Sequence, residues 1–354
     1  MNGRQNSSTK RSLHDHLVRL FRFRRPGSIL ILLLAPVLAM SITVAAQTRT
    51  LRLASTAWSP FTNAPGKARY ALDLVHTALE RLGIRAETTI VEESRLTSSL
   101  IAGEFDGSAA LWRDEQREQA LLYSQPYLQN RLILVGRNGS DVSAKALPDL
   151  VGKRLALVEG YAYGDKVKDP NGPTYVPSLS EEDSLEKLLH GDADYTLMDE
   201  LVVEYLIKNY SEEARTKLAF GSKPLILRTL HLAVRKSLPD AQSIIDHFNA
   251  ELIKMVTDRS YNRLLQLDWI LADVDGDGRA EYVPRDDQVG QNAPDHSYKL
   301  FTDRVTPDSP SGPSFYLGGK VYPSWSSVPD GYKVNRAPGT FSEGTQFTIF
   351  TFKF

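Results

Sequence analysis

The sequence predicts an α/β fold in which strands and helices alternate along most of the chain. Apolar residues recur at helical spacing in some segments and form short continuous runs in others, which is typical of amphipathic helices and buried strands. Glycines such as Gly83 and Gly103 end the helical segments. Strands that alternate with helices form sheets that bind ligands at the carboxyl ends of the strands.

The expected elements follow one another from residue 50. The predicted strands cover residues 51–54, 90–91, 132–135, 155–158, 195–198 and 230–234. The predicted helices cover residues 72–82, 96–101, 185–189, 200–209 and 244–256. Ser180 and Asp183 resemble a capping box at the start of the third helix. After residue 269 the helical periodicity disappears, and residues 285–354 are expected to form a Pro/Gly-rich tail of short strands and turns.

The composition is that of an ordinary globular protein, with 42% hydrophobic and 24% charged residues among 354. No cysteine is present, which excludes disulfides, thiolate metal sites, a cysteine nucleophile and a lipid anchor on cysteine. Seven of the 42 basic residues but only one of the 43 acidic residues precede Gln47. The rest of the chain is therefore acidic, which argues against nucleic acid as a partner.

Residues 1–46 are interpreted as a secretory signal peptide. Arg24 and Arg25 precede an apolar run, and Val44 and Ala46 place small residues before a cleavage site at Gln47. The alternative is an uncleaved membrane anchor, because the 19 mostly apolar residues 28–46 are just long enough to span a bilayer. Cleavage predicts a periplasmic protein.

Six stretches, in the same order, resemble the bacterial extracellular solute-binding proteins, family 3, over about residues 50–270. They are the opening strand 51–54 with its turn 58–61, LIAGEFD at 100–106, RE at 117–118 with YSQPY at 123–127, LVGKRLA at 150–156, GDAD at 191–194 with MD at 198–199, and 230–236. Each stretch alone is weakly specific, whereas six in order are strongly specific.

The resemblance implies a two-lobed type II periplasmic binding fold, with each lobe a sheet flanked by helices and two crossings between the lobes. Lobe 1 is expected to cover residues 50–128 and 235–270, and lobe 2 residues 129–234. Such a protein closes about its hinge around a small polar, amino-acid-like ligand. It is expected to be a monomer that delivers its ligand to an inner-membrane ABC permease, without enzymatic activity or a cofactor. The alternatives are a dehydratase-like enzyme on the same fold and a membrane-anchored sensory receptor.

Three candidate ligand-binding residues match the family pattern, and a fourth, Phe61, lies next to one of them. Arg117 corresponds to the arginine that grips the ligand carboxylate, which suits the two parallel hydrogen bonds of a guanidinium. Asp199 corresponds to the acid for the ligand ammonium, although an aspartate there also suits a helix N-cap. Trp58 corresponds to an aromatic cover, and Phe61 lies behind it, where core packing is the alternative.

Two further stretches depart from the family pattern. Tyr161 and Ala162 fall where the family offers backbone N–H groups to an anion, but this chain carries bulky tyrosines there. Trp112 falls in the stretch where the family usually has a threonine. We therefore expect a narrower pocket, suited to an aromatic, modified or peptide-like ligand rather than an ordinary polar amino acid.

Residues 271–284 contain an acidic loop that resembles the first part of an EF-hand. Its candidate metal ligands are Asp273, Asp275, Asp277, Arg279 and Glu281, with Gly278 at the sixth position of the loop. Pro284 stands where an EF-hand has its bidentate glutamate. The loop predicts a structural Ca²⁺ site, and a solvated acidic turn is the alternative.

Overall fold

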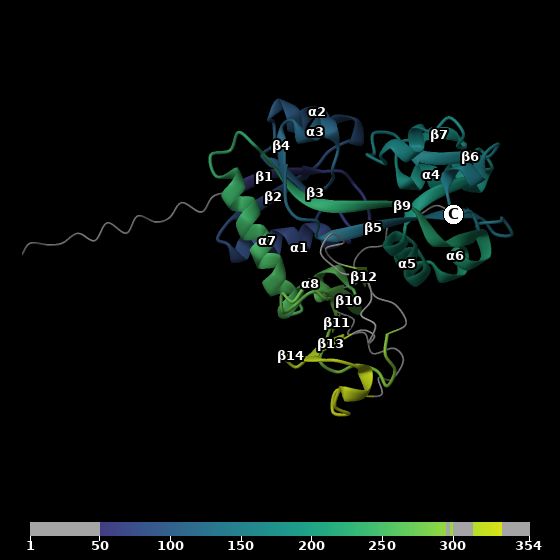
Figure 1. The fold of residues 1–354 in the computed structure, drawn as a ribbon. Helices are drawn as coiled ribbons and strands as arrows, with labels where there is room; N and C mark the ends of the chain where they lie inside the picture. Colours follow the sequence, from purple (N-terminus) through teal and green to yellow (C-terminus); the bar gives the residue numbers. More distant parts are fainter. Residues whose placement is uncertain (1–49, 295–297, 300–313, 335–354) are drawn as a thin grey trace, which may run out of the picture. The chain divides into compact units, whose positions relative to one another are not determined.

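The computed structural model describes residues 50–294, 298–299 and 314–334, and its strands form two sheets (Figure 1). The predicted signal peptide and much of the predicted tail lie outside the described residues. The larger sheet contains β1 (Thr50–Ser55), β2 (Arg85–Ile90), β3 (Gly107–Trp112), β4 (Leu121–Tyr123), β5 (Leu128–Arg137), β6 (Arg154–Val158), β7 (Thr174–Ser178), β8 (Tyr195–Asp199) and β9 (Leu218–Arg235). The smaller sheet contains β10 (Trp269–Ala272), β11 (Glu281–Pro284), β12 (Tyr298–Lys299), β13 (Ser314–Leu317) and β14 (Lys320–Tyr322).

The larger sheet divides into two lobes that share two long strands. Its order is β2-β1-β3-β9-β5-β8-β6-β7, and β4 also pairs with β9. Parallel strands lie on each side, because β1 pairs with β2 and β3, and β6 pairs with β7 and β8. The long strand β9 pairs with β3 and β4 through residues 230–235 and with β5 through residues 218–230. β5 and β9 therefore form the connection between the lobes, and the exact lobe boundaries stay a prediction.

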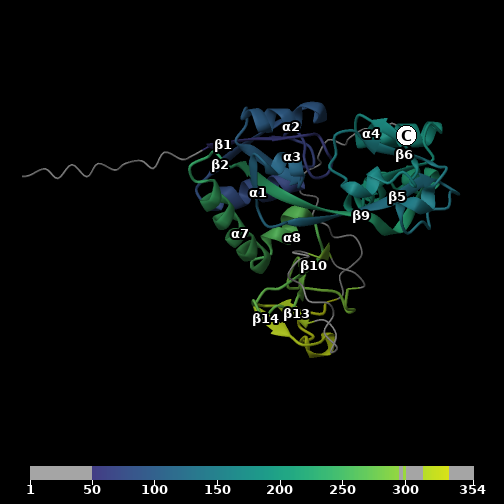
Figure 2. The ribbon, with the colours of Figure 1, turned by 45° about the horizontal axis from the view of Figure 1, so that its top comes forward.

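Helices flank both ends of this sheet. They are α1 (Tyr70–Arg81), α2 (Glu93–Ala102), α3 (Glu115–Glu118), α4 (Glu181–His190), α5 (Glu200–Asn209), α6 (Ser211–Lys217), α7 (Ala241–Thr257) and α8 (Ser260–Leu265), with 3-10 turns at Leu147–Leu150, Asp165–Lys168 and Trp325–Ser327. α1, α7 and α8 pack on one another (Figure 2). Each of the five predicted helices is present, and within the described residues no helix is long and apolar enough to cross a membrane.

The predicted cap of α4 is present. Ser180 Oγ accepts a hydrogen bond from the Asp183 backbone N–H at 3.2 Å, and the Asp183 carboxylate accepts one from the Leu179 backbone N–H at 2.7 Å. The first bond satisfies a backbone donor in the first turn of the helix, which has no partner within the helix itself, and the second holds the residue before the cap. This cap fixes the position of the next residue, Glu181.

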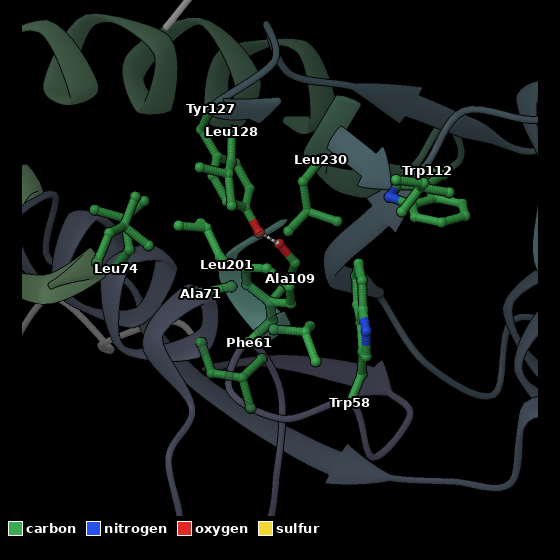
Figure 3. Close-up of a cluster of buried hydrophobic side chains, with 14 of the residues drawn as sticks. Trp58, Phe61, Ala71, Leu74, Ala109, Trp112, Tyr127, Leu128, Leu201 and Leu230 are labelled. Atoms are coloured by element: carbon green, nitrogen blue, oxygen red, sulfur yellow. Dashed lines mark hydrogen bonds between the residues drawn. The ribbon is translucent and has the colours of Figure 1, made fainter. Parts of the chain in front are cut away.

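The main hydrophobic core brings together residues from β3, β5, β9, α1 and α5 (Figure 3). Phe61 is 1% exposed and Tyr127 is fully buried. The Tyr127 hydroxyl donates to the Ala109 carbonyl oxygen at 2.9 Å, which satisfies a polar atom that burial would otherwise leave unpaired. Trp58 and Trp112 lie at one edge of this cluster, and their rings meet edge to face with centroids 5.5 Å apart.

The smaller sheet is joined to the first lobe through α8. The Asn262 side-chain amide donates to the Val283 carbonyl oxygen at 3.0 Å, and Arg259 pairs with Asp287 at 2.5 Å. Residues of β10 and β11 belong to the main hydrophobic core, whereas a second cluster lies around Phe315 and Leu317 of β13. The expectation of a β-containing C-terminal segment is confirmed for the described residues.

Candidate ligand-binding site

The ends of several strands bring the predicted site residues to one place. Trp58 follows β1, Trp112 ends β3, Arg117 lies in α3, and Tyr161 and Ala162 follow β6. One cavity of about 30 Å³ is lined by Thr56, Trp58, Glu93, Leu96, Ala110, Leu111, Trp112, Arg117, Tyr161, Ala162 and Leu230. Five of the seven predicted ligand residues therefore meet at this cavity, and Phe61 and Asp199 are not part of its lining.

Arg117 is held in a fixed position. The carboxylate of Asp114, the N-cap of α3, accepts from the Arg117 backbone N–H. The guanidinium donates to Thr97 Oγ1 at 2.9 Å and to the Gly160 carbonyl oxygen of the other lobe at 3.4 Å. Its side chain is only 5% exposed. A buried, preoriented guanidinium is suited to a bidentate bond with a carboxylate.

Glu93 lies beside this arginine, with 3.9 Å between Glu93 Oε1 and Arg117 Nη2. Burial raises the pKa of the Glu93 carboxyl, while the positive charge of Arg117 and a hydrogen bond with Thr56 oppose that rise. The sequence analysis missed Glu93 and Thr56. Glu93 lies outside the six stretches that carry the family resemblance, and Thr56 lies between the strand and the turn of the first stretch, where neither pattern includes it.

Aromatic rings from the two lobes pack against one another beside the cavity. Trp112 lies 5.5 Å from Trp58, 5.4 Å from Tyr161 and 5.8 Å from Tyr163, measured between ring centroids. Phe61 packs behind Trp58 at 4.5 Å, within the core. The cavity is small, since ligand pockets usually measure hundreds of Å³, and a narrowing of the pocket by Trp112 stays a prediction.

Glu181 connects the two lobes through a side chain that the sequence analysis did not select. The Trp58 indole N–H donates to Glu181 Oε1 at 2.8 Å, across 123 residues of sequence. Burial raises the pKa of this carboxyl well above its ordinary value, and the negative charges of Glu182 and Asp199 raise it further. The predicted cap at Ser180 located the start of the helix, but a glutamate in a first turn is common and gives no sign of burial.

Asp199 is fully buried and serves as the N-cap of α5. One carboxylate oxygen accepts from the Leu201 backbone N–H at 2.8 Å. The other accepts from the Asn130 side chain at 3.0 Å and the Arg131 backbone N–H at 2.9 Å. Burial raises the pKa of this carboxyl to about 7 against the opposing effect of these bonds. The capping alternative is confirmed, and contact with a ligand stays a prediction.

The acidic loop between β10 and β11 gathers three of its five predicted ligands. Asp273, Asp275 and Glu281 each place a carboxylate oxygen within 4.8 Å of the others. Asp277 instead accepts from the Arg279 backbone N–H at 2.8 Å. Glu281 is buried and also accepts from the Val274 backbone N–H and the Ser314 hydroxyl. Three converging carboxylates suit a hard divalent cation, and the calcium site stays a prediction.

Comparison with known proteins agrees with this architecture. The model of the bacterial extracellular solute-binding proteins, family 3, matches residues 55–271. No curated protein matches the chain.

Similar solved structures lie below 25% identity. An ancestral arginine-binding protein bound to arginine has a TM-score of 0.53 at 23% identity, covering 61% of this chain and 96% of that one. A mutant of ArgBP from T. maritima has a TM-score of 0.52 at 24% identity, with 61% and 93% covered. A histidine kinase sensor domain with similarity to periplasmic binding proteins has a TM-score of 0.52 at 21% identity, with 62% and 94% covered. These likenesses show the two-lobed type II periplasmic binding fold.

Proposed function

The chain belongs to the bacterial extracellular solute-binding proteins, family 3, and from that membership we propose that it binds a small amino-acid-like solute between its lobes. In this proposal the protein acts in the periplasm after cleavage of residues 1–46. It delivers its ligand to an inner-membrane ABC permease. It carries out no reaction of its own and needs no cofactor.

The observation that carries this proposal is the environment of Arg117. Its guanidinium is buried at the cavity and contacts Thr97 of one lobe and Gly160 of the other. A ligand carboxylate that took the place of Glu93 as the partner of Arg117 would bind a side chain that already contacts both lobes, and would so favour closure. Trp58, Trp112, Tyr161 and Ala162 would surround the rest of the ligand.

Entry of the ligand requires the lobes or the aromatic rings to separate. A cavity of about 30 Å³ holds water but no amino acid. The connection through β5 and β9 supports a hinge motion, because bending of these two strands can separate the lobes while the parallel strands on each side keep their pairing. The protein would then exist in an open form that admits the ligand and a closed form that holds it.

Removal of Arg117 tests the proposal. A thermal-shift screen of the purified protein against amino acids, amines and small peptides identifies a ligand, and calorimetry measures its affinity. Arg117→Ala is expected to weaken binding by about a hundredfold or more, since it removes a desolvated charge partner. Arg117→Lys is expected to recover only part of the affinity, because an ammonium lacks the planar fork of donors.

Arg113→Ala is the matched control, because Arg113 lies four residues away, is 55% exposed and pairs with Glu118. Its affinity should equal that of the unchanged protein. Equal affinity of Arg117→Ala and the unchanged protein would refute the role of Arg117, and a protein that binds nothing in the screen would refute the proposed function.

A sensory receptor is the second candidate, supported by the likeness to a histidine kinase sensor domain. The two candidates differ in the fate of the N-terminal apolar segment. Mass spectrometry of the protein from a bacterial envelope separates them. A soluble periplasmic chain beginning at Gln47 supports transport, and an intact chain in the membrane fraction supports the receptor.

A further inference from the structure

Glu181 carries a buried carboxylate, and the group that donates a hydrogen bond to it is neutral. Its residue is 8% exposed, and it accepts a hydrogen bond from the Trp58 indole. No ion pair is recorded for it in the described part of the chain. The charged groups that act on it, Glu182 and Asp199, are also acidic. A buried charge usually has a counter-charge, because desolvation of an unpaired ion is very unfavourable.

Asp199 is also a buried carboxylate with neutral donors, but both of its carboxylate oxygens already accept hydrogen bonds from the protein. It accepts from one side-chain amide and two backbone N–H groups, all neutral. Arg131, whose backbone N–H bonds to Asp199, directs its guanidinium to Glu200 at 2.5 Å instead. Of these two carboxylates, Glu181 is the one bonded to a residue that lines the cavity.

The surroundings of Glu181 suit a cation. Four aromatic rings contact one another near Glu181, from Trp58, Trp112, Tyr161 and Tyr163. Each ring pair that joins a tryptophan to a tyrosine has its centroids 5.4 to 5.9 Å apart. Ring faces attract ammonium and guanidinium groups, and more strongly where water is excluded. Trp58 and Trp112 belong to one lobe and the tyrosines to the other, so separation of the lobes would expose a gap with aromatic walls on both sides.

We propose that Glu181 pairs with a cationic group of the bound ligand, which takes the place of the Trp58 indole as its partner. The ligand class is thus a solute with a carboxylate for Arg117 and an ammonium or guanidinium for Glu181. This inference rests on the proposed function and deepens it. It also assigns the Trp58–Glu181 bond to the unliganded protein, where it holds the lobes together until a ligand replaces it.

Glu181→Gln is the decisive variant. Glutamine keeps an oxygen that accepts from the Trp58 indole and removes only the charge. The control is Glu182→Gln, which makes the same change one residue later in the same helix turn. Thermal unfolding of both variants establishes that they are folded. Calorimetry then compares L-arginine, L-lysine and agmatine with L-citrulline, the uncharged near-isostere of arginine, and with succinate.

The unchanged protein and Glu182→Gln are expected to bind at least one of the cationic probes, and Glu181→Gln is expected to bind it about a hundredfold more weakly. A loss for arginine but not citrulline would identify the side-chain cation as the partner, and an equal loss for both would identify the α-ammonium. Either result supports the proposal.

Unchanged affinity of Glu181→Gln for every probe or screened ligand that the unchanged protein binds would overturn the inference, and so would tightest binding of succinate. The proposed function would survive either result if Arg117→Ala still abolished binding. Absence of all binding by the unchanged protein would instead overturn both.

Discussion

Three side chains from different strands are linked by consecutive hydrogen bonds behind the aromatic rings of the cavity. The Trp112 indole N–H donates to Asn130 Oδ1 at 2.7 Å, and the Asn130 amide donates to Asp199 at 3.0 Å. Asn130 and Asp199 are fully buried and Trp112 is 6% exposed. Because the Trp112 indole N–H has a buried partner, the orientation of this ring at the cavity is fixed.

The ionisation of Asp199 predicts a pH dependence of stability. Its pKa is about 7 in the folded protein and lower in the unfolded chain, so the folded state holds an extra proton between these values. This carboxyl therefore stabilises the fold most below about pH 4, and that contribution is lost as the pH rises through about 7. The total change is up to about 4 kcal/mol.

The measurement is the free energy of unfolding in urea from about pH 5 to about pH 8, for the unchanged protein and Asp199→Asn. The difference in stability between the two proteins should change steeply with pH, because asparagine does not ionise. Glu93 titrates in both proteins and cancels in that difference, because Asp199 is not among the groups that shift its pKa. A constant difference across the range would contradict the raised pKa.

Single residues differed in how far the sequence revealed their roles. Arg117 was identified because the YSQPY stretch that follows it fixed its register in the family pattern. Glu181 was missed because its burial depends on Trp58, which lies 123 residues away. A local pattern describes a helix start well, but it contains no information on which distant side chain will cover that start.

Strands β3 and β9 approach closely at Gly107. A Cβ added there would lie 2.0 Å from the Ala233 carbonyl oxygen and 2.9 Å from Val234 Cα, both backbone atoms that cannot rotate away. Gly107→Ala is therefore expected to reduce the free energy of unfolding by about 3 kcal/mol or more through overpacking. Urea unfolding followed by circular dichroism measures this loss.

Gly66→Ala separates overpacking from backbone strain. Gly66 has a φ of +84° and no atom within 4 Å of an added Cβ. The expected loss there is about 1 kcal/mol, from the left-handed backbone conformation alone. Equal losses at Gly66 and Gly107 would argue that β3 and β9 are not as close as the structure shows.

The long strands were predicted only in part. Residues 132–135 and 230–234 were recognised from their apolar runs, whereas β5 and β9 extend well beyond them in both cases. Polar residues such as Asn130, Arg131 and Arg228 interrupt the apolar pattern near the connection between the lobes. Pro224 adds a second interruption, and it lies where the β5–β9 register shifts, a position that tolerates proline. Strands β3, β4 and β7 were not predicted.

At the scale of the whole molecule, the alternation of strands and helices was enough to predict the α/β class. The smaller sheet was expected only as irregular β structure, because its pairing joins segments far apart in sequence. Glu281 of β11 pairs with Ser314 of β13, for example. Neither segment has a pattern that selects the other, so the pairing emerges only in the folded chain.

The position of the acidic loop predicts that bound calcium stabilises the main hydrophobic core as well as the loop itself. The loop joins β10 to β11, whose residues Ile270 and Val283 belong to the main core, and Asn262 of α8 bonds to β11. A cation held by Asp273, Asp275 and Glu281 would offset the mutual repulsion of three carboxylates. EGTA is therefore expected to lower the melting temperature by about 2–4 °C relative to millimolar Ca²⁺.

Two variants show whether this loop is responsible for the calcium effect. Asp275→Asn removes one of the converging carboxylates, and its melting temperature should no longer respond to EGTA. Asp330→Asn is the matched control, because that side chain is fully exposed and outside the loop, and it should keep the full response. An equal response of both variants would place calcium elsewhere, and no response in the unchanged protein would leave the loop as a solvated acidic turn. The loss of response in Asp275→Asn alone would establish that a cation at this loop stabilises the core through β10 and β11.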